Sequence, residues 1–196
     1  MRMKRRRFIT IDGPNGVGKT IIVGLVCREI RDLGWNVLQT KEPTKTFNRA
    51  NEEKHGAELA RLIIDDRRLH LTNEVEPALT QGVCVVCDRY IESSLVYRKL
   101  DGIPFEDTWK ENCSFRIPDM SVLIIASVPM LEERLKSKKT LSRFEREYTP
   151  EEELVLYQGV HKFLSDRGFK SVVIKNEGVA PEVVAKHIAA LIMRLA

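Results

Sequence analysis

The chain has 196 residues, of which 43% are hydrophobic and 31% are charged, and its formal net charge is +4. This length and balance are typical of a soluble globular protein with one sizeable α/β domain. No apolar run is as long as a membrane span, and the basic residues 1–7 lack the apolar core of a secretion signal, so we expect neither membrane association nor secretion.

The positive charge is concentrated at the N-terminus, where residues 1–7 hold five basic side chains. No basic stripe with interleaved aromatic residues accompanies them, so we expect a solvated arm and no nucleic-acid partner. Cys84 and Cys87 lie in a strand pattern that points them to opposite faces, which predicts buried thiols rather than a metal site. Reduced thiols without a secretion signal indicate a cytoplasmic protein.

The first expected strand, residues 8–12, runs directly into a glycine-rich loop. Residues 13–20 read Gly-Pro-Asn-Gly-Val-Gly-Lys-Thr and fit the pattern G-x-x-x-x-G-K-[ST] of a phosphate-binding loop. The glycines let successive backbone N–H groups point into one concavity, and the helix that follows directs its positive end to the same place. Lys19 would then contact the outer phosphates, and the Thr20 hydroxyl would ligate Mg²⁺.

Strand-like and helix-like segments alternate along the rest of the chain, which is typical of βαβ units and a parallel sheet. Further strands are expected at residues 35–40, 83–87, 121–126 and 170–174. Helices are expected after the phosphate-binding loop, at 52–71, around 74–79, around 93–94, around 109, at 130–136, at 150–167 and from 181 onward. The strongly basic stretch at about 136–148 has little apolar periodicity, so we expect a short flexible lid there.

These segments predict a single three-layer α/β/α domain over residues 1–196, built on a five-stranded parallel sheet. In such sheets ligands lie beyond the carboxyl ends of the strands. Three polar motifs, at residues 13–20, 42–43 and 88–89, each follow an expected strand. We therefore expect them to surround one crevice.

Phosphoryl transfer requires Mg²⁺, groups that hold the acceptor, and cations that stabilise the developing charge. Asp88 is a candidate outer-sphere partner of Mg²⁺, the alternative being a cap on the next turn. Arg89 is a candidate bidentate clamp for an acceptor phosphate, the alternative being a surface ion pair. The charged run at 66–68 fits a solvated helix face as well as a binding group. The basic lid residues would close over a triphosphate unless the loop is merely solvated; they are Lys136, Lys138, Lys139, Arg143 and Arg146.

Taken in order, these motifs resemble those of the thymidylate kinase family of P-loop nucleoside monophosphate kinases. The matching features are the loop at 13–20, Lys41-Glu42-Pro43, Asp66-Arg67 before His70, Asp88-Arg89-Tyr90 with Ser93-Ser94, and Arg143-Phe144-Glu145. The resemblance covers nearly the whole chain. It implies ATP and Mg²⁺ as cofactors and transfer of the γ-phosphoryl group of ATP to a deoxynucleoside 5′-monophosphate, with dTMP as the expected acceptor. A homodimer is suggested by the resemblance alone.

The resemblance also assigns roles by position. ATP would be held by Gly13, Asn15, Gly16, Val17, Gly18, Lys19 and Thr20, with Thr20 and Asp88 at the metal. The acceptor would be bound by Glu42, Ile63, Arg67, Arg89, Ser93, Ser94, Tyr97 and Phe144. The residues expected to act in catalysis are Lys19, Arg89, Lys138 and Arg143.

The chain departs from the family pattern mainly on the acceptor side. Asn15 stands where family members usually place a carboxylate, and Ile63 stands where thymine usually stacks on an aromatic residue, so Phe47 or Phe144 would have to cover the base. Gly16 occupies a position where some members carry a catalytic arginine, which would leave that task to the lid. Two alternatives therefore stay open: a related kinase for another or a modified nucleoside monophosphate, and a non-catalytic ATP-binding module.

Overall fold

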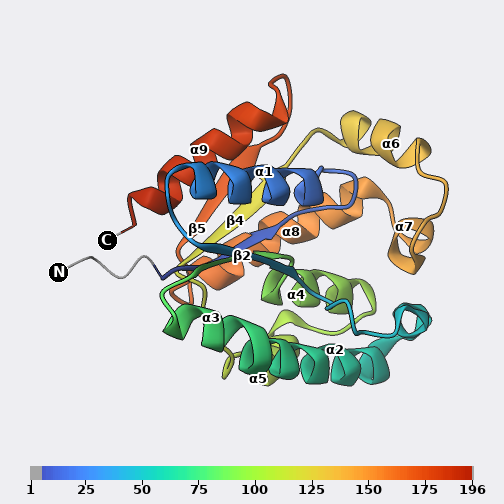
Figure 1. Cartoon of the computed structure of the whole chain (residues 1–196). Helices are drawn as coiled ribbons and strands as arrows, with labels where there is room; N and C mark the ends of the chain where they lie inside the picture. Colours follow the sequence, from blue (N-terminus) through green and yellow to red (C-terminus); the bar gives the residue numbers. More distant parts are fainter. Residues whose placement is uncertain (1–5, 196) are drawn as a thin grey trace.

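A computed structural model describes residues 6–195, and within them five strands form one parallel sheet in the order β2-β3-β1-β4-β5 (Figure 1). The strands are β1 (Phe8–Asp12), β2 (Val37–Lys41), β3 (Cys84–Asp88), β4 (Met120–Ile125) and β5 (Ser171–Lys175). Strands β1, β3 and nearly all of β4 are buried, as expected for near-continuously apolar parallel strands, whereas the edge strands β2 and β5 are partly exposed.

Helices cover both faces of the sheet (Figure 1). Helices α1 (Lys19–Asp32) and α9 (Pro181–Met193) pack together over one face. The other face carries α2 (Gly56–His70), α3 (Glu76–Thr80), α4 (Ile91–Leu100), α5 (Phe105–Asn112) and α8 (Pro150–Ser165). Cys84 belongs to the core cluster on the first side and Cys87 to the cluster on the second, so the two thiols do point to opposite faces. The predicted three-layer α/β/α fold is confirmed.

Helix starts follow their local sequence. Helix α8 begins at Pro150, as expected, after the N-cap residue Thr149. The Thr149 hydroxyl accepts a hydrogen bond from the backbone N–H of Glu152 at 3.2 Å, and the Glu152 carboxylate accepts one from the backbone N–H of Thr149 at 2.7 Å. These reciprocal contacts form a capping box, which satisfies N–H groups that the first turn leaves free.

The expected lid loop contains more regular structure than the sequence pattern indicated. Helix α6 (Val128–Lys136) is followed by residues 137–142 and then by a short helix, α7 (Arg143–Glu147). Ser142 and Glu145 form a second capping box, which explains why a helix interrupts the basic stretch. Figure 1 shows α6 and α7 at the end of the molecule toward which the strands run.

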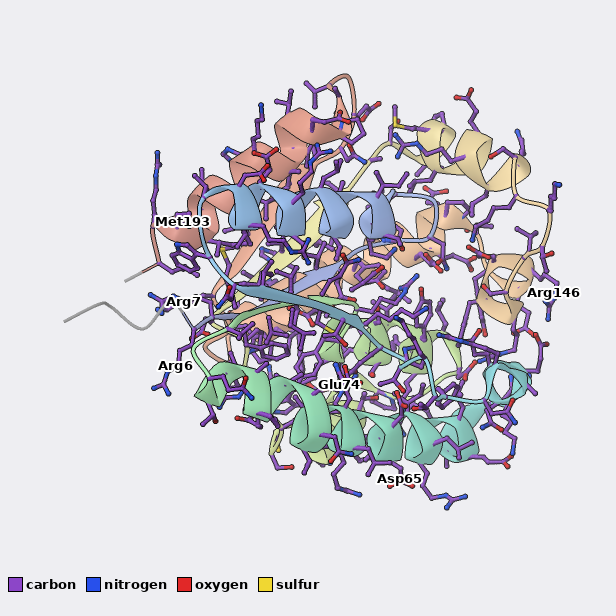
Figure 2. All side chains as sticks on the ribbon, in the orientation of Figure 1. Arg6, Arg7, Asp65, Glu74, Arg146 and Met193 are labelled. Atoms are coloured by element: carbon purple, nitrogen blue, oxygen red, sulfur yellow. The ribbon has the colours of Figure 1, made fainter. Side chains whose placement is uncertain are left out.

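Two other segments refine the expected boundaries. The helix expected at 52–71 begins only at Gly56, after a 3₁₀ turn (Arg49–Glu53), and continues through a π-helical turn (Leu71–Val75) into α3. Residues 1–5 of the expected basic arm lie outside the described residues. Arg7 donates a hydrogen bond to the carbonyl of Leu195 at 2.7 Å, and Figure 2 shows Arg6 and Arg7 on the side of the molecule where Met193 lies. Within residues 6–195, no helix combines the length and apolarity needed to span a membrane.

The sheet register brings the polar motifs together. Asp88 at the end of β3 pairs with Ile11 of β1 on one side and with Lys41 of β2 on the other. The loop after β1, the Glu42-Pro43 pair after β2 and Arg89 after β3 therefore leave the sheet at the same edge. The convergence expected from the sequence is confirmed.

Candidate active site

A cavity of about 760 Å³ lies at the carboxyl ends of the strands, between the phosphate-binding loop, helices α2 and α4, and the lid. Its volume is typical of small-molecule sites. Nearly all the predicted site residues line it: Asn15, Gly16, Gly18, Lys19, Thr20, Glu42, Ile63, Arg67, Asp88, Arg89, Ser93, Ser94, Tyr97, Lys138, Arg143 and Phe144. Gly13 and Val17 are the predicted site residues that do not. Val17 is fully buried in the core, and a Cβ atom on Gly13 would lie 2.2 Å from the carbonyl oxygen of Ile124.

The phosphate-binding loop depends on backbone conformations that favour glycine. Gly16 and Gly18 have φ angles of +79° and +91°, in the left-handed region. Lys19 opens helix α1 and folds back onto the loop, where its Nζ donates to the carbonyls of Gly13 at 2.7 Å and Pro14 at 2.8 Å. Burial, reinforced by the nearby Arg89 guanidinium, lowers the pKa of Lys19 to about 7. The loop and the first turn of α1 form an anion-binding concavity of the kind that phosphates occupy.

The metal expectation rests on Thr20 and Asp88. The Thr20 hydroxyl donates to Asp88 Oδ2 at 2.7 Å, and Asp88 Oδ1 is buried without a hydrogen-bond partner among the described residues. These hard oxygen donors suit Mg²⁺, which commonly takes few protein ligands and completes its shell with phosphate oxygens and water. Across residues 6–195, no group of three or more His, Cys, Asp or Glu side chains could hold a metal ion by itself.

Arg89 is held in place on the cavity wall. Its own backbone adopts φ = +72°, and its N–H donates to the carbonyl of Ile11 at 3.0 Å. The guanidinium donates to the Tyr97 hydroxyl at 2.7 Å, to Ser93 Oγ at 3.1 Å and to the Tyr157 hydroxyl at 3.1 Å. The surface ion pair offered as an alternative is therefore wrong, because Arg89 sits inside the cavity in a network of neutral hydroxyls.

Arg89 also contacts the phosphate-binding loop. Its Nη2 donates to Asn15 Oδ1 at 2.6 Å, and Asn15 in turn contacts Glu153 on helix α8. Sequence reasoning missed both Glu153 and Tyr157, because nothing in the pattern of α8 sets these two positions apart from ordinary helix residues.

The charged run at 66–68 divides between three environments. Arg67 is only 1% exposed and lines the cavity, where its Nε donates to Glu42 Oε2 at 2.7 Å and its Nη2 to Ser94 Oγ at 3.0 Å. Its Nη1 donates to Asn112.

Asp66, in contrast, accepts a hydrogen bond from the backbone N–H of Thr44 at 2.8 Å. Arg68 is exposed and pairs with Asp65 at 3.1 Å, on the outer face where Figure 2 labels Asp65. Arg67 alone of the three belongs to the site.

His70 contacts Glu42, the carboxylate that holds Arg67. It is 2% exposed, and its Nδ1 lies 3.0 Å from Glu42 Oε1, while its Nε2 lies 2.7 Å from Thr40 Oγ1. From the sequence, His70 was given no role of its own. The structure shows His70 as a buried support of Glu42, a contact that the i, i+3 spacing from Arg67 on α2 could have suggested.

The apolar wall of the cavity carries Ile63 together with neighbouring aliphatic side chains of α2. Phe144 of the lid stacks on Tyr97, with ring centroids 4.3 Å apart and an interplanar angle of 29°. Phe47, the other aromatic residue considered for the base, is buried and does not line the cavity. Phe144 is thus the better placed of the two.

The two lid cations expected to act in catalysis, Lys138 and Arg143, are paired with acidic side chains in this structure. Arg143 is 1% exposed and makes a bidentate contact with Asp101, at 2.8 and 3.1 Å, and a contact with Glu147 at 3.0 Å. Lys138 pairs with Glu145 at 2.5 Å, and Lys139 is exposed and does not line the cavity.

A further arginine, Arg134 of α6, was missed by sequence reasoning. It donates hydrogen bonds to two carbonyls of the phosphate-binding loop, those of Gly16 at 3.3 Å and Val17 at 3.2 Å.

The phosphate-binding loop opens a helix, a carboxylate lies against the threonine of that loop, and the guanidinium groups of Arg67 and Arg89 face the same cavity. These features define the class of ATP-dependent P-loop phosphotransferases. The sequence matches the family model described as thymidylate kinase over residues 11–178. It is 31% identical to a thymidylate kinase of Caldicellulosiruptor saccharolyticus over 193 residues, covering 92% of this chain and 93% of that protein.

Other curated relatives agree. A thymidylate kinase of Geobacillus thermodenitrificans is 29% identical over an alignment of 205 residues, with 96% of this chain and 90% of that protein covered. A probable thymidylate kinase of Pyrococcus abyssi is 33% identical over 156 residues, with 72% and 76% covered. The chain belongs to the thymidylate kinase family.

Proposed function

We propose that the protein transfers the γ-phosphoryl group of ATP to dTMP, giving dTDP and ADP. The observation that carries this proposal is that one cavity has a phosphate-binding loop on one side and the fixed guanidinium of Arg89 on another. Such an arrangement holds a donor and an acceptor phosphate in the same enclosed space, and phosphoryl transfer depends mainly on positioning and charge stabilisation.

On the donor side, the loop residues would hold the ATP phosphates through backbone N–H groups and Lys19. Thr20 and Asp88 would hold Mg²⁺, which neutralises charge on the phosphate oxygens when it is bound. Gly13 and Val17 would act indirectly, since they shape the loop from below.

On the acceptor side, Arg89 would hold the monophosphate, with Ser93 and Tyr97 keeping the guanidinium in place. Arg67, fixed by Glu42 and Ser94, would contact the polar edge of the base. Ile63 and Phe144 would provide the apolar surface around it.

The lid, at about residues 136–148, would exclude water, with Lys138 and Arg143 as the expected cations. We treat the chain as one kinase domain with nucleotides as its small-molecule partners. A cytoplasmic location and a homodimer are part of the same proposal. The buried thiols of Cys27, Cys84 and Cys87 are consistent with a reducing compartment.

The test is a coupled ADP-release assay with ATP and Mg²⁺ and a panel of nucleoside monophosphates. Turnover that is fastest in kcat/KM with dTMP supports the proposal. Faster turnover with another monophosphate would support the related kinase, which Ile63 at the stacking position favours. If no monophosphate in the panel causes ADP release, the result would support the non-catalytic ATP-binding module.

A further inference from the structure

Asn15 lies between two groups of opposite charge, the buried carboxylate of Glu153 and the partly buried guanidinium of Arg89. Its backbone N–H donates to Glu153 Oε2 at 2.6 Å and its Nδ2 donates to Glu153 Oε1 at 2.6 Å. Its Oδ1 accepts a hydrogen bond from Arg89 Nη2, also at 2.6 Å. The amide therefore presents its donor side to a carboxylate and its acceptor side to a guanidinium, with every polar atom used in its natural direction.

This orientation accounts for an asparagine at this position. An aspartate side chain has no N–H, so one of its oxygens would face Glu153 Oε1 at hydrogen-bond distance, and two adjacent carboxylates repel each other. Glu153 is only 3% exposed and position 15 is partly buried, so water screens that repulsion weakly. An amide at position 15, rather than a carboxylate, is therefore the side chain that suits the Glu153 carboxylate on α8.

We propose that Glu153 is a positioning residue for the acceptor phosphate and acts through Asn15 on Arg89. This inference rests on the proposed function, since it assumes that Arg89 binds the acceptor. Glu153 does not line the cavity, so it has no direct contact with a ligand there. Its carboxylate fixes the plane of the Asn15 amide, and the amide oxygen fixes one arm of the Arg89 guanidinium. A residue of helix α8 thereby sets the position of the Arg89 guanidinium, the expected phosphate clamp at the end of β3.

The proposal is tested by exchanging the two groups. Four proteins are compared: wild type, Asn15→Asp, Glu153→Gln, and the double variant. In Asn15→Asp two carboxylates face each other. In Glu153→Gln the glutamine NH₂ faces an Asn15 donor, because Asn15 offers two donors to the two oxygens of Glu153. In the double variant, the new glutamine on α8 accepts the backbone N–H of residue 15 and donates to the new carboxylate there, which still accepts from Arg89.

We expect each single variant to lose kcat/KM for dTMP by about tenfold to a hundredfold, because small misplacements of a binding group have effects of this size. The double variant should return to within about threefold of wild type. The loss should appear mainly in acceptor KM, with the KM for ATP much less affected in Glu153→Gln. A general loss of stability would not produce this split or the recovery.

Glu151→Gln is the matched control. Glu151 lies in the same first turn of α8 and carries the same charge, but its side chain is exposed. It should leave kcat/KM for dTMP unchanged. Thermal melts of all variants monitor folding. If Asn15→Asp alone does not fold, the comparison of Glu153→Gln with the double variant still decides, because only the proposed pairing predicts that a second substitution restores the first.

Additive losses in the double variant, or an Asn15→Asp protein as active as wild type, would overturn the proposal. Failure of the proposed function is recognised separately, from the wild type. If wild type phosphorylates no nucleotide, the same four proteins are compared by calorimetry for binding of inorganic phosphate. If each single variant binds phosphate more weakly and the double variant recovers, the result supports the Glu153–Asn15–Arg89 chain. Equal phosphate affinities in all four proteins, or additive losses in the double variant, reject it.

Discussion

Ile63 gives the base side of the cavity an aliphatic rather than an aromatic surface on helix α2. An aromatic contact contributes about 0.5–1.5 kcal/mol beyond the area it buries. We predict that Ile63→Phe improves the preference for dTMP over other pyrimidine monophosphates by about tenfold in kcat/KM. The assay is run on wild type and variant side by side. A wild type that already prefers dTMP several hundredfold, together with a variant that loses the preference, would show that the pocket recognises the base in another way.

The buried Lys19 ammonium donates hydrogen bonds to the backbone carbonyls of Gly13 and Pro14 in its own loop. When phosphates are bound, its charge is expected to be most valuable in the transition state. We predict that Lys19→Ala lowers kcat by about a hundredfold or more, in line with the roughly 2.7–4 kcal/mol lost on removing one such donor. Steady-state kinetics measure the effect, and circular dichroism checks the fold. A loss below about tenfold would count strongly against phosphoryl transfer at this loop.

Glu92 is a buried carboxyl group that the proposed chemistry does not use. It is 4% exposed in α4, where it accepts a hydrogen bond from the Ser121 hydroxyl. Burial, together with the negative charge of Asp12, raises its pKa to about 8, and the positive charge of Arg67 opposes the shift. The folded protein therefore retains a proton that the unfolded chain releases above about pH 4.5, so this group makes the fold less stable as pH rises from there toward 8.

Glu92→Gln should remove this dependence. The glutamine oxygen can still accept from Ser121, and no charge develops. Urea unfolding at pH 7.0, 7.5, 8.0 and 8.5 measures the free energy of unfolding. Between pH 7.0 and 8.0 wild type should lose about 1 kcal/mol more than the variant, and the difference should level off above pH 8, where the folded protein also releases the proton. Parallel pH profiles for the two proteins would mean that Glu92 is already ionised in the fold.

At the scale of elements, the lid helix α7 is tied to the loop after α4. The bidentate Arg143–Asp101 pair is buried, and Phe144 packs on Tyr97 of α4. Figure 2 places Arg146 at the outer side of the lid, where it pairs with Glu53 at 2.6 Å. Breaking one partner of a buried pair is usually far more disruptive than losing an exposed one.

We therefore predict that Asp101→Asn speeds trypsin cleavage after Lys138 and Lys139 by about tenfold, because the lid opens more often. Glu147→Gln is the control, since Glu147 contacts the same arginine from within α7 itself, at i, i+4 spacing. Cleavage is followed by mass spectrometry without nucleotide. Equal cleavage rates in wild type and Asp101→Asn would show that the ion pair does not hold the lid.

The elements that sequence predicted well are those whose signal is local. The phosphate-binding loop and the start of α8 at Thr149 are specified by consecutive residues, and both appear as expected. The start of α7 also had a local signal, the Ser142–Glu145 capping box, but the absence of apolar periodicity concealed it. Glu153 and Arg134 gave no local signal at all. Their contacts with the phosphate-binding loop join residues more than a hundred positions apart, so they exist only in the folded chain.

At the scale of the whole molecule, the parallel sheet explains why the rest of the site was predictable. Parallel strands bring their carboxyl ends to one edge, so motifs that follow different strands must converge. Their convergence could be inferred without side-chain detail. The partner of each side chain could not be inferred in this way. Arg67, Asp66 and Arg68 are consecutive in the sequence, yet each contacts a different part of the molecule.

The central claim is that one cavity brings the γ-phosphate of ATP to an acceptor held by Arg89. The most direct measurement follows a radioactive label from the γ-phosphate of ATP in the presence of dTMP and Mg²⁺, with products separated by chromatography. The account predicts that the label appears in dTDP and that an Arg89→Ala variant transfers little of it. Label found only in inorganic phosphate, or retained in ATP, would contradict the account.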